Sequence, residues 1–270
     1  MKKCYIDMLA MIITNKCNLD CGHCLHGKKD NTTMSNEVIK SSLDQIKGIG
    51  TLTICGGEAT LALDRLEYII NYIITNKILV EELTITINGT IYSEYLLELL
   101  KEIDSYINEE GIRSSLAISY DKYHIEEMKK LSILEEYFEN IKKYMESKYF
   151  YSLRELTEKP FREGNAEKLK RLQTVPLRSP KKFITYVNKD HEFDKNGLCL
   201  IGPLVSVNTQ GIITECDASE IHQESIYNYG SVFETSFESS ALNNKAKILT
   251  PKEFFPACEK EWKRYLTYKK

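Results

Sequence analysis

Three cysteines and two histidines lie within ten positions near the start of the chain, in the stretch NKCNLDCGHCLHG. They are Cys17, Cys21, His23, Cys24 and His26. Thiolates and imidazoles bind zinc and iron–sulfur clusters, and a Cys-x-x-Cys pair can also act as a redox dithiol. The stretch is therefore compatible with three kinds of protein: a dithiol oxidoreductase, a zinc protein or an iron–sulfur protein.

The spacing of the cysteines bears on this choice. Cys21 and Cys24 have the dithiol spacing, but that interpretation leaves Cys17 without a role. Zinc could be held by the three cysteines with His26, although zinc sites usually arrive as paired Cys-x-x-Cys knuckles and this cluster stands alone. The third interpretation is a [4Fe–4S] cluster on Cys-x₃-Cys-x₂-Cys, which would leave one of its four irons open because four cysteines are normally needed.

Composition excludes several classes of protein. The chain has 270 residues, enough for one large domain or a large domain with a small appendage, and its net charge of −3 gives no electrostatic case for nucleic-acid binding. No apolar run approaches the roughly 20 residues that a membrane span needs. Asp7 interrupts the apolar N-terminal run and no small-residue cleavage site follows, so we expect a first strand and a cytoplasmic protein. Eight cysteines in that compartment indicate metal binding or catalysis rather than disulfides.

The rest of the sequence supplies the elements that must position the cluster. Apolar, β-rich runs alternate with amphipathic ones, which predicts βαβ units, a mainly parallel sheet and a partial (β/α)6 TIM-like barrel. Strands are predicted at 5–14, 51–55, 83–88, 115–120, 148–153 and 183–187, and helices at 35–47, 62–76, 93–108, 125–146 and 165–173. The clearest helical period lies in 125–146, whose predicted core face is Met128, Leu131, Leu134, Phe138, Ile141 and Met145.

The alternation changes after residue 190, which predicts a barrel at 1–190 and a smaller α+β module at 191–270. Two short strands around Asn208–Gly211 predict a hairpin, with Gly211 in the turn, where a positive φ is needed. This hairpin is expected to bring Cys199 and Cys216 near one another.

Polar motifs follow the predicted strands, and with the cysteines they resemble the radical S-adenosylmethionine (SAM) enzymes over residues 5 to about 190. Cys17, Cys21, His23 and Cys24 match the family's Cys-x₃-Cys-x-aromatic-Cys, with His23 in the aromatic position. Further matches are Gly56-Gly57-Glu58 after the second strand, Asn88-Gly89-Thr90 after the third, Ser119 and Asp121 with nearby His124 after the fourth, and Gly164-Asn165-Ala166 after the fifth. Because active-site groups gather at the C-terminal ends of parallel barrel strands, these motifs should converge on one face.

The resemblance implies a cofactor, a reaction and a set of residue roles. Cys17, Cys21 and Cys24 would hold a [4Fe–4S] cluster whose open iron is chelated by the amino and carboxylate groups of SAM. An electron from the cluster breaks the sulfonium bond, and the 5′-deoxyadenosyl radical removes a hydrogen atom from the substrate. At the methionyl end of SAM, the implied roles are a charge-assisted bond from the ammonium to Glu58, close backbone approach at Gly56 and Gly57, and a contact from Asn88. At the other end, Ser119 and Asp121 would contact the ribose and His23 the adenine. Ala59 and Asn165 depart from the family's usual Pro and Arg.

The C-terminal module resembles the auxiliary-cluster modules called SPASM and twitch. This implies a second [4Fe–4S] cluster on Cys199, Cys216 and Cys258. A twitch module usually has a fourth cysteine three positions after the third, where this chain has Glu261; that residue, Asp217, His222 or substrate could supply the remaining ligand. The alternative is that the three are buried structural cysteines, as Cys4 and Cys55 are expected to be.

Two classes of function remain open. The first is a radical SAM oxidoreductase whose substrate is a peptide, as in maturases of ribosomal natural products, or else a small metabolite, as in twitch-type dehydrogenases. Its electron donor would be a flavodoxin or ferredoxin, with no nucleic-acid or membrane partner. A first strand at residue 5 leaves no N-terminal domain to grip a leader peptide, although such a domain can be a separate protein. The second class is a non-catalytic zinc protein.

Overall fold

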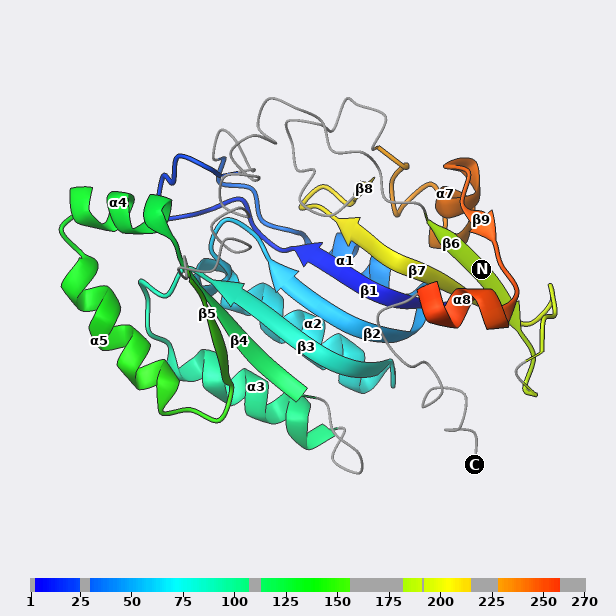
Figure 1. Cartoon of the computed structure of the whole chain (residues 1–270), viewed down its shortest axis with the longest axis horizontal. Coiled ribbons are helices and arrows are strands. Elements are labelled where there is room, and N and C mark those ends of the chain that lie inside the picture. The colour runs from blue at the N-terminus through cyan, green and yellow to red at the C-terminus, as the bar shows by residue number, and fades with distance from the viewer. Residues whose placement is uncertain are drawn as a thin grey trace.

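The computed structural model describes residues 3–24, 30–106, 113–155, 182–190, 192–214 and 228–257. Its centre is a nine-stranded sheet with the order β5-β4-β3-β2-β1-β7-β6-β9, and β8 pairs with β7 off this path (Figure 1). The parallel run consists of β1 (Cys4–Ile12), β2 (Ile46–Cys55), β3 (Leu79–Ile87), β4 (Arg113–Tyr120) and β5 (Phe150–Glu155). The sheet is not closed, so the predicted α/β class with a partial barrel is confirmed.

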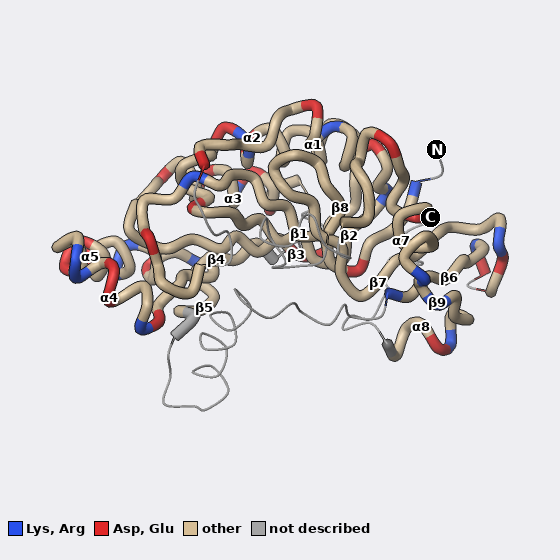
Figure 2. The backbone as a smooth tube through the Cα atoms, turned by 90° about the horizontal axis from the view of Figure 1, so that it is seen from above, with Lys and Arg blue, Asp and Glu red and all other residues tan. Residues whose placement is uncertain are grey.

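Three helices cover one face of this parallel run (Figure 2). They are α1 (Asn36–Leu43), α2 (Leu63–Thr75) and α3 (Glu94–Tyr106). The 3₁₀ turn η1 (Ala59–Ala62) leads from β2 into α2. Each helix buries an apolar stripe at helical spacing, such as Leu66, Ile69, Ile70 and Ile73 of α2. Among the described residues, no helix is long and apolar enough to cross a membrane.

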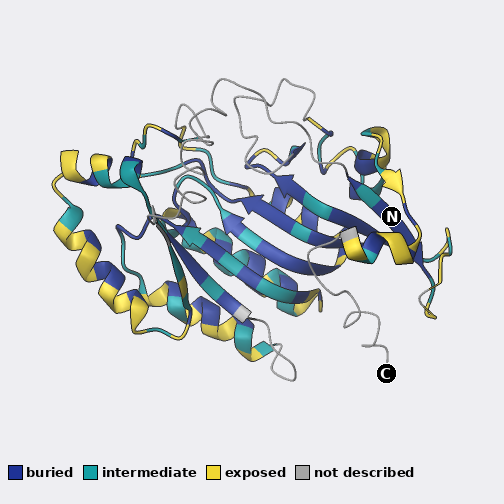
Figure 3. Ribbon diagram, in the orientation of Figure 1, coloured by how far each residue is buried: buried dark blue, intermediate teal, exposed yellow. Residues whose placement is uncertain are grey.

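The two faces of the central strands have different chemistry. Leu52, Ile54 and Ile85 belong to the same apolar core as the helices. The central strands are mostly buried (Figure 3). Since successive side chains of a strand point to opposite faces, Thr53 and Thr84 lie on the face away from the helices. The face of the sheet away from the helices therefore carries hydroxyl groups.

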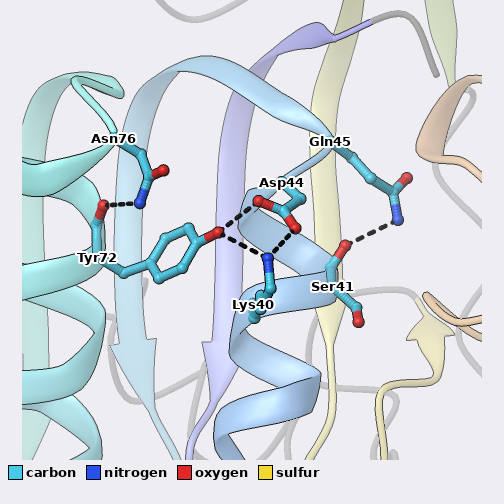
Figure 4. A network of polar contacts seen from close by, with 6 residues as sticks. All are labelled: Lys40, Ser41, Asp44, Gln45, Tyr72 and Asn76. Atoms are coloured by element: carbon cyan, nitrogen blue, oxygen red, sulfur yellow. Dashed lines mark hydrogen bonds and ion pairs between the residues drawn. The ribbon is translucent and has the colours of Figure 1, made fainter.

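Polar contacts join α1 to α2 at the surface (Figure 4). Lys40 donates to Asp44 at 2.6 Å within α1 and its cap, and the hydroxyl of Tyr72 on α2 donates to the same carboxylate. Nearby, Gln45 donates to the carbonyl of Ser41 at 3.0 Å. Gln45 also donates to Val232 O at 3.2 Å, which connects this corner to the C-terminal part of the chain.

The C-terminal strands join the same sheet. β7 (Leu198–Val207) pairs in parallel with β1 and antiparallel with β6 (Phe183–Val187) and β8 (Ile213–Thr214). The predicted hairpin is confirmed, and Gly211 in its turn has φ +80°. The remaining elements are α7 (Phe237–Asn243), β9 (Lys247–Ile248) and α8 (Pro251–Ala257).

The strand predicted at 183–187 is present, but it pairs with β7 and β9, so it does not extend the parallel run beyond β5. The division of the chain at residue 190 remains a prediction. What the sheet establishes is that β7, on the far side of that division, hydrogen-bonds directly to β1.

The helix predicted at 125–146 is two helices, α4 (Lys122–Lys130) and α5 (Leu134–Met145). The chain turns between them at Ser132, which has φ +57°, and the turn resets the helical phase. The predicted core face is therefore partly wrong: Leu131, Phe138 and Met145 are exposed, whereas Tyr137 and Tyr144 are fully buried. The helix predicted at 165–173 lies outside the described residues.

Candidate cofactor site

The predicted motifs gather at the C-terminal edge of the parallel sheet. Beyond β1 the chain forms what we call the cysteine loop, residues 13–24. Its first half is tied to the end of β2, where Glu58 donates its N–H to Lys16 O at 2.7 Å. Its second half reaches the end of β4, where His23 Nε2 lies 2.9 Å from Asp121 Oδ2. The expected convergence of strand-end motifs is thus present in the structure.

Gly56 and Gly57 are required by the packing of this loop. A Cβ atom on Gly56 would lie 2.4 Å from Thr14 O, and one on Gly57 would lie 2.3 Å from Lys16 O. The Gly57 N–H donates to Thr14 O at 2.7 Å. The prediction from the sequence was that these glycines let the backbone approach SAM closely. The approach that the structure shows is to the backbone of the cysteine loop.

Glu58 joins the ends of β2 and β3. Its side chain is buried, with only 1% exposed. Oε1 accepts from the N–H of Thr60 at 3.0 Å and from its hydroxyl at 2.6 Å, and Oε2 accepts from the N–H of Asn88 at 2.6 Å. Burial raises the pKa of the Glu58 carboxyl, and these donors only partly oppose the shift.

Asn88 connects the end of β3 to Cys17. Its Nδ2 donates to Asn18 Oδ1 at 2.8 Å and lies 3.9 Å from Cys17 Sγ. Its Oδ1 accepts from the N–H of Thr90 at 3.0 Å and from its hydroxyl at 2.7 Å. The Leu19 N–H points at the same sulfur at 3.4 Å. Two N–H groups thus converge on Cys17 Sγ, an arrangement that stabilises a thiolate.

Cys21 and Cys24 belong to the same turn, in which the Cys24 N–H donates to Cys21 O at 2.9 Å. All three cysteines of the loop are partly exposed, and Cys17 and Cys21 also pack against the apolar core. His23, between them, is buried and stacks on Tyr123 with ring centroids 4.8 Å apart.

Asp121 is the N-cap of α4 and contacts two histidines. Its Oδ1 accepts from the N–H groups of Tyr123 and His124, and its Oδ2 lies 2.9 Å from both His23 Nε2 and His124 Nδ1. Burial alone would raise the pKa of the Asp121 carboxyl, but the two imidazoles hold it well below its usual range. Ser119 precedes it at the end of β4, where its carbonyl accepts from the Tyr137 hydroxyl at 3.3 Å.

The predicted auxiliary ligands are only partly described. Cys199 is fully buried in the apolar core and pairs in register with Cys4 across β1 and β7. Cys55 is partly buried, with Sγ 3.8 Å from Met11 O. The other residues of the predictions for this module and for the fifth-strand motif lie outside the described residues: Cys216, Asp217, His222, Cys258, Glu261 and Gly164-Asn165-Ala166.

A family model describes this combination of strand and motif. The model of the radical SAM superfamily matches residues 11–155, more than half of the chain. The chain belongs to the radical SAM superfamily. Membership makes it an enzyme of that superfamily and implies a [4Fe–4S] cluster and SAM.

Individual relatives are more distant. An uncharacterized protein of Methanocaldococcus jannaschii, MJ0907, is 29% identical over 100 residues, which are 36% of this chain and 35% of that protein. The chain thus spans about a third of the length of the curated relative it matches.

The solved structures that resemble this chain include two proteins bound to peptides. Native anSMEcpe with bound AdoMet and Cp18Cys peptide has TM-score 0.49 and 14% identity, over 87% of this chain and 79% of that one. Streptococcus suis SuiB bound to its precursor peptide SuiA has TM-score 0.42 and 14% identity, over 88% and 64%. At such identities the likeness concerns the fold.

Two residues that support the site, Asn18 and Thr60, were not predicted from the sequence, and Thr90 was named only as part of its motif, without a role. Thr60 holds the Glu58 carboxylate, and Asn18 donates to the Thr90 hydroxyl at 2.7 Å. A signal was available for Thr60, because a threonine two residues after a strand-end acid can hydrogen-bond it locally. No short-range signal connects Asn18 to a partner 72 positions away.

Proposed function

We propose that this enzyme cleaves SAM reductively and uses the 5′-deoxyadenosyl radical to abstract a hydrogen atom from a peptide substrate. The observation that carries the proposal is a convergence at one edge of the sheet. Cys17 Sγ meets the N–H of Leu19 and the amide of Asn88, and the backbone N–H of Asn88 donates to Glu58. A structural zinc site would not need a buried carboxylate and glycine turn in register with the cysteines.

The residues at this edge fit an iron–sulfur cluster. Cysteine thiolates are the usual cluster ligands, and hydrogen bonds to their sulfurs help to set the reduction potential. Cys17, Cys21 and Cys24 would hold the cluster, which when bound supplies the electron for SAM cleavage. Asn88 Nδ2 and the Leu19 N–H place positive dipoles beside Cys17 Sγ and stabilise its charge.

The surrounding residues would orient SAM. Glu58 places a buried negative charge at the junction of β2 and β3, suited to the methionyl ammonium. Asn88 keeps this corner closed, because its amide bridges Thr90 and Asn18. Ser119, at the end of β4, is the better candidate for a ribose hydroxyl, since both carboxylate oxygens of Asp121 already contact the protein: Oδ1 accepts from two backbone N–H groups, and Oδ2 lies 2.9 Å from each of two imidazoles.

The face of the sheet away from the helices supports a polar substrate. Ser206, Ala10, Thr53, Thr84 and Ser115 stand in one row across β7, β1, β2, β3 and β4. Thr84 and Ser115 are 3.1 Å apart between their hydroxyls. Thr53, Thr84 and Ser115 of this row are partly exposed, whereas Ser206 is buried and Ala10 has no hydroxyl. The hydroxyls of Thr53, Thr84 and Ser115 offer donors and acceptors to an extended main chain. We therefore place the peptide substrate on this face.

We further propose that a second cluster is held by Cys199, Cys216 and Cys258 in a twitch-like module. Support comes from the spacing of Cys199 and Cys216 around the β7–β8 hairpin, and the burial of Cys199 in the core is the observation that opposes it. The iron content of a variant lacking Cys17, Cys21 and Cys24 tests this point. About four irons per chain are expected to remain, and an iron-free folded variant would contradict the second cluster.

The substrate class is tested with the anaerobically reconstituted enzyme, SAM and a flavodoxin or dithionite as reductant. Short peptides encoded beside the gene should stimulate 5′-deoxyadenosine formation and lose or gain mass as they are modified. Small polyols and sugars serve as the comparison. Stimulation by a polyol alone would replace the peptide by a small metabolite and support a dehydrogenase.

A further inference from the structure

We propose that Asp121 is a positioning residue for the cysteine loop: through His23 it holds the turn bearing Cys21 and Cys24 against the first turn of α4. The inference goes beyond the proposed function, because it concerns the fold of the loop before any cofactor binds. It also gives Asp121 a task other than ribose binding.

The two carboxylate oxygens of Asp121 contact different groups. Oδ1 accepts from the N–H of Tyr123 at 2.9 Å and of His124 at 3.1 Å, so it fixes the start of α4. Oδ2 lies 2.9 Å from His23 Nε2 and 2.9 Å from His124 Nδ1. One carboxylate therefore connects the helix end, a helix side chain and the cysteine loop.

The His23 ring is held on its flat sides as well as at its edge. It stacks on Tyr123 with an interplanar angle of 18°, and it meets the ring of His124 edge-on at 5.0 Å. Only 6% of the side chain is exposed. Because Tyr123 and His124 belong to the helix that Asp121 caps, the carboxylate orients these two partners of His23 and contacts the imidazole itself.

This anchor complements another one in the first half of the loop. There, Glu58 donates to Lys16 O, and Asn88 contacts Asn18 and Cys17. The anchors come from the ends of β2 and β3 for residues 16–18, and from the end of β4 for His23. The cysteine loop is thus fixed to three strand ends, which sets where its thiols stand relative to each other.

The side chains of His23, Asp121 and His124 also have the donor set of a divalent-cation site, with ligand atoms within 4.8 Å of one another. A cation on His23 Nε2 would force the imidazole proton onto Nδ1. Nδ1 is buried and has no hydrogen-bond partner in the part of the chain that the structure describes. An N–H orphaned there carries a desolvation penalty, whereas a lone pair costs less, so the arrangement favours a carboxylate clamp with the proton on Nε2.

The test uses the full-length protein without iron, under reducing and anaerobic conditions, and follows amide hydrogen exchange by mass spectrometry. Asp121→Ser keeps a good N-cap for α4 but is too short to reach the imidazoles. We expect exchange in residues 17–24 to become roughly tenfold faster or more, as loss of a charge-assisted contact predicts. Exchange in β1 and β4 should stay unchanged.

Two further variants make the result specific. Ser236→Ala removes the N-cap of α7, far along the sequence, and controls for a general loss of stability. His23→Ala should speed exchange in the same segment, and adding Asp121→Ser to it should have little further effect, because the two residues act through one contact. Asp121→Asn keeps the length of the side chain and should restore part of the protection.

Three outcomes would overturn the proposal. The first is exchange of residues 17–24 in Asp121→Ser that matches Ser236→Ala. The second is acceleration spread evenly over the chain, which would make Asp121 a general stability residue. The third is stoichiometric Mn²⁺ binding to the wild-type protein that His124→Ala abolishes, since thiolates suit Mn²⁺ poorly and the trio would then be a cation site. The exchange experiment contains no cluster and no SAM. A negative result in it therefore leaves the proposed reaction untouched, and a failure to cleave SAM leaves the contact between Asp121 and His23 untouched.

Discussion

Replacement of Glu58 by Gln is the substitution for which the structure gives the most detailed expectation. The change keeps the shape of the side chain and turns one acceptor oxygen into an NH₂ donor. Oε1 faces the N–H of Thr60 at 3.0 Å, and Oε2 faces the N–H of Asn88 at 2.6 Å. Whichever way the amide is turned, one buried backbone N–H meets a donor and loses its acceptor.

The expected cost follows from that orphaned N–H. An unsatisfied buried donor costs about 1–3 kcal/mol, and the melting temperature of the iron-free protein should fall by roughly 2–12 °C. Thr60→Val is the matched control. It removes only the hydroxyl that donates to Glu58 at 2.6 Å, leaves the carboxylate in place, and should cost about 1 kcal/mol.

The effect should also depend on pH, with a defined sign. Burial raises the pKa of the Glu58 carboxyl in the folded protein, so folding favours its protonated form. The wild type therefore gains stability as the pH falls through the folded pKa toward the unfolded one, and this gain is lost as the pH rises again. Gln does not titrate, so the difference in unfolding free energy between wild type and Glu58→Gln should widen as the pH is lowered toward the ordinary pKa of a glutamate carboxyl.

Denaturant unfolding at several pH values and SAM binding to the reconstituted enzyme are the two assays. Loss of a charge-assisted bond weakens SAM binding by roughly ten- to a hundredfold, with no change in iron content. Thr60→Val should bind SAM within a few-fold of wild type. Unaltered stability together with unaltered SAM affinity in Glu58→Gln would refute the reasoning, and Gly56-Gly57-Glu58 would then be only a turn.

Three other predictions concern the cysteines and their supports. Asn88→Ala removes the N–H beside Cys17 Sγ and should lower the cluster's reduction potential in an EPR-monitored titration; an equal or higher potential would contradict the contact. Gly57→Ala places a Cβ 2.3 Å from Lys16 O and should destabilise the iron-free protein by about 1–3 kcal/mol or more while reducing iron uptake; a fully stable variant with normal iron would be inconsistent with this packing. Cys216→Ala should lower the iron content by about half and leave the SAM-binding cluster's EPR signal intact; unchanged iron would remove Cys216 from the ligands.

The parallel core was predictable because its signals are local. Apolar runs of strand length alternate with amphipathic helices, and each of β1 to β4 ends in a polar motif, so the location of the site followed from chain order. The hairpin at Asn208–Gly211 was equally local, since Gly211 needs the positive φ of its turn.

Long-range pairing was not predictable in the same way. Nothing near β7 in the sequence shows that it pairs with β1, 195 residues earlier by the register of Cys4 with Cys199. The break between α4 and α5 escaped detection because the apolar period continues through Ser132, and only the positive φ at that residue shifts the phase. Exposed Phe138 and Met145 are the consequence.

Within the site, residue types were easier to predict than partners. Glu58, Asn88 and Asp121 were singled out for SAM, yet in the structure each contacts other protein groups. These contacts depend on how strand ends approach one another, which a single sequence does not record. A ligand role and a supporting role share the same residue types, and measurements on variants separate them.

The central claim is that Cys17, Cys21 and Cys24 hold the cluster that cleaves SAM, and the most direct test is 5′-deoxyadenosine formation under dithionite. The wild-type protein and a Cys17→Ala/Cys21→Ala/Cys24→Ala variant are reconstituted side by side without oxygen, and the product is quantified by mass spectrometry. We predict steady formation by the wild type and none by the folded triple variant. Cleavage of SAM by the triple variant at the wild-type rate would contradict the account.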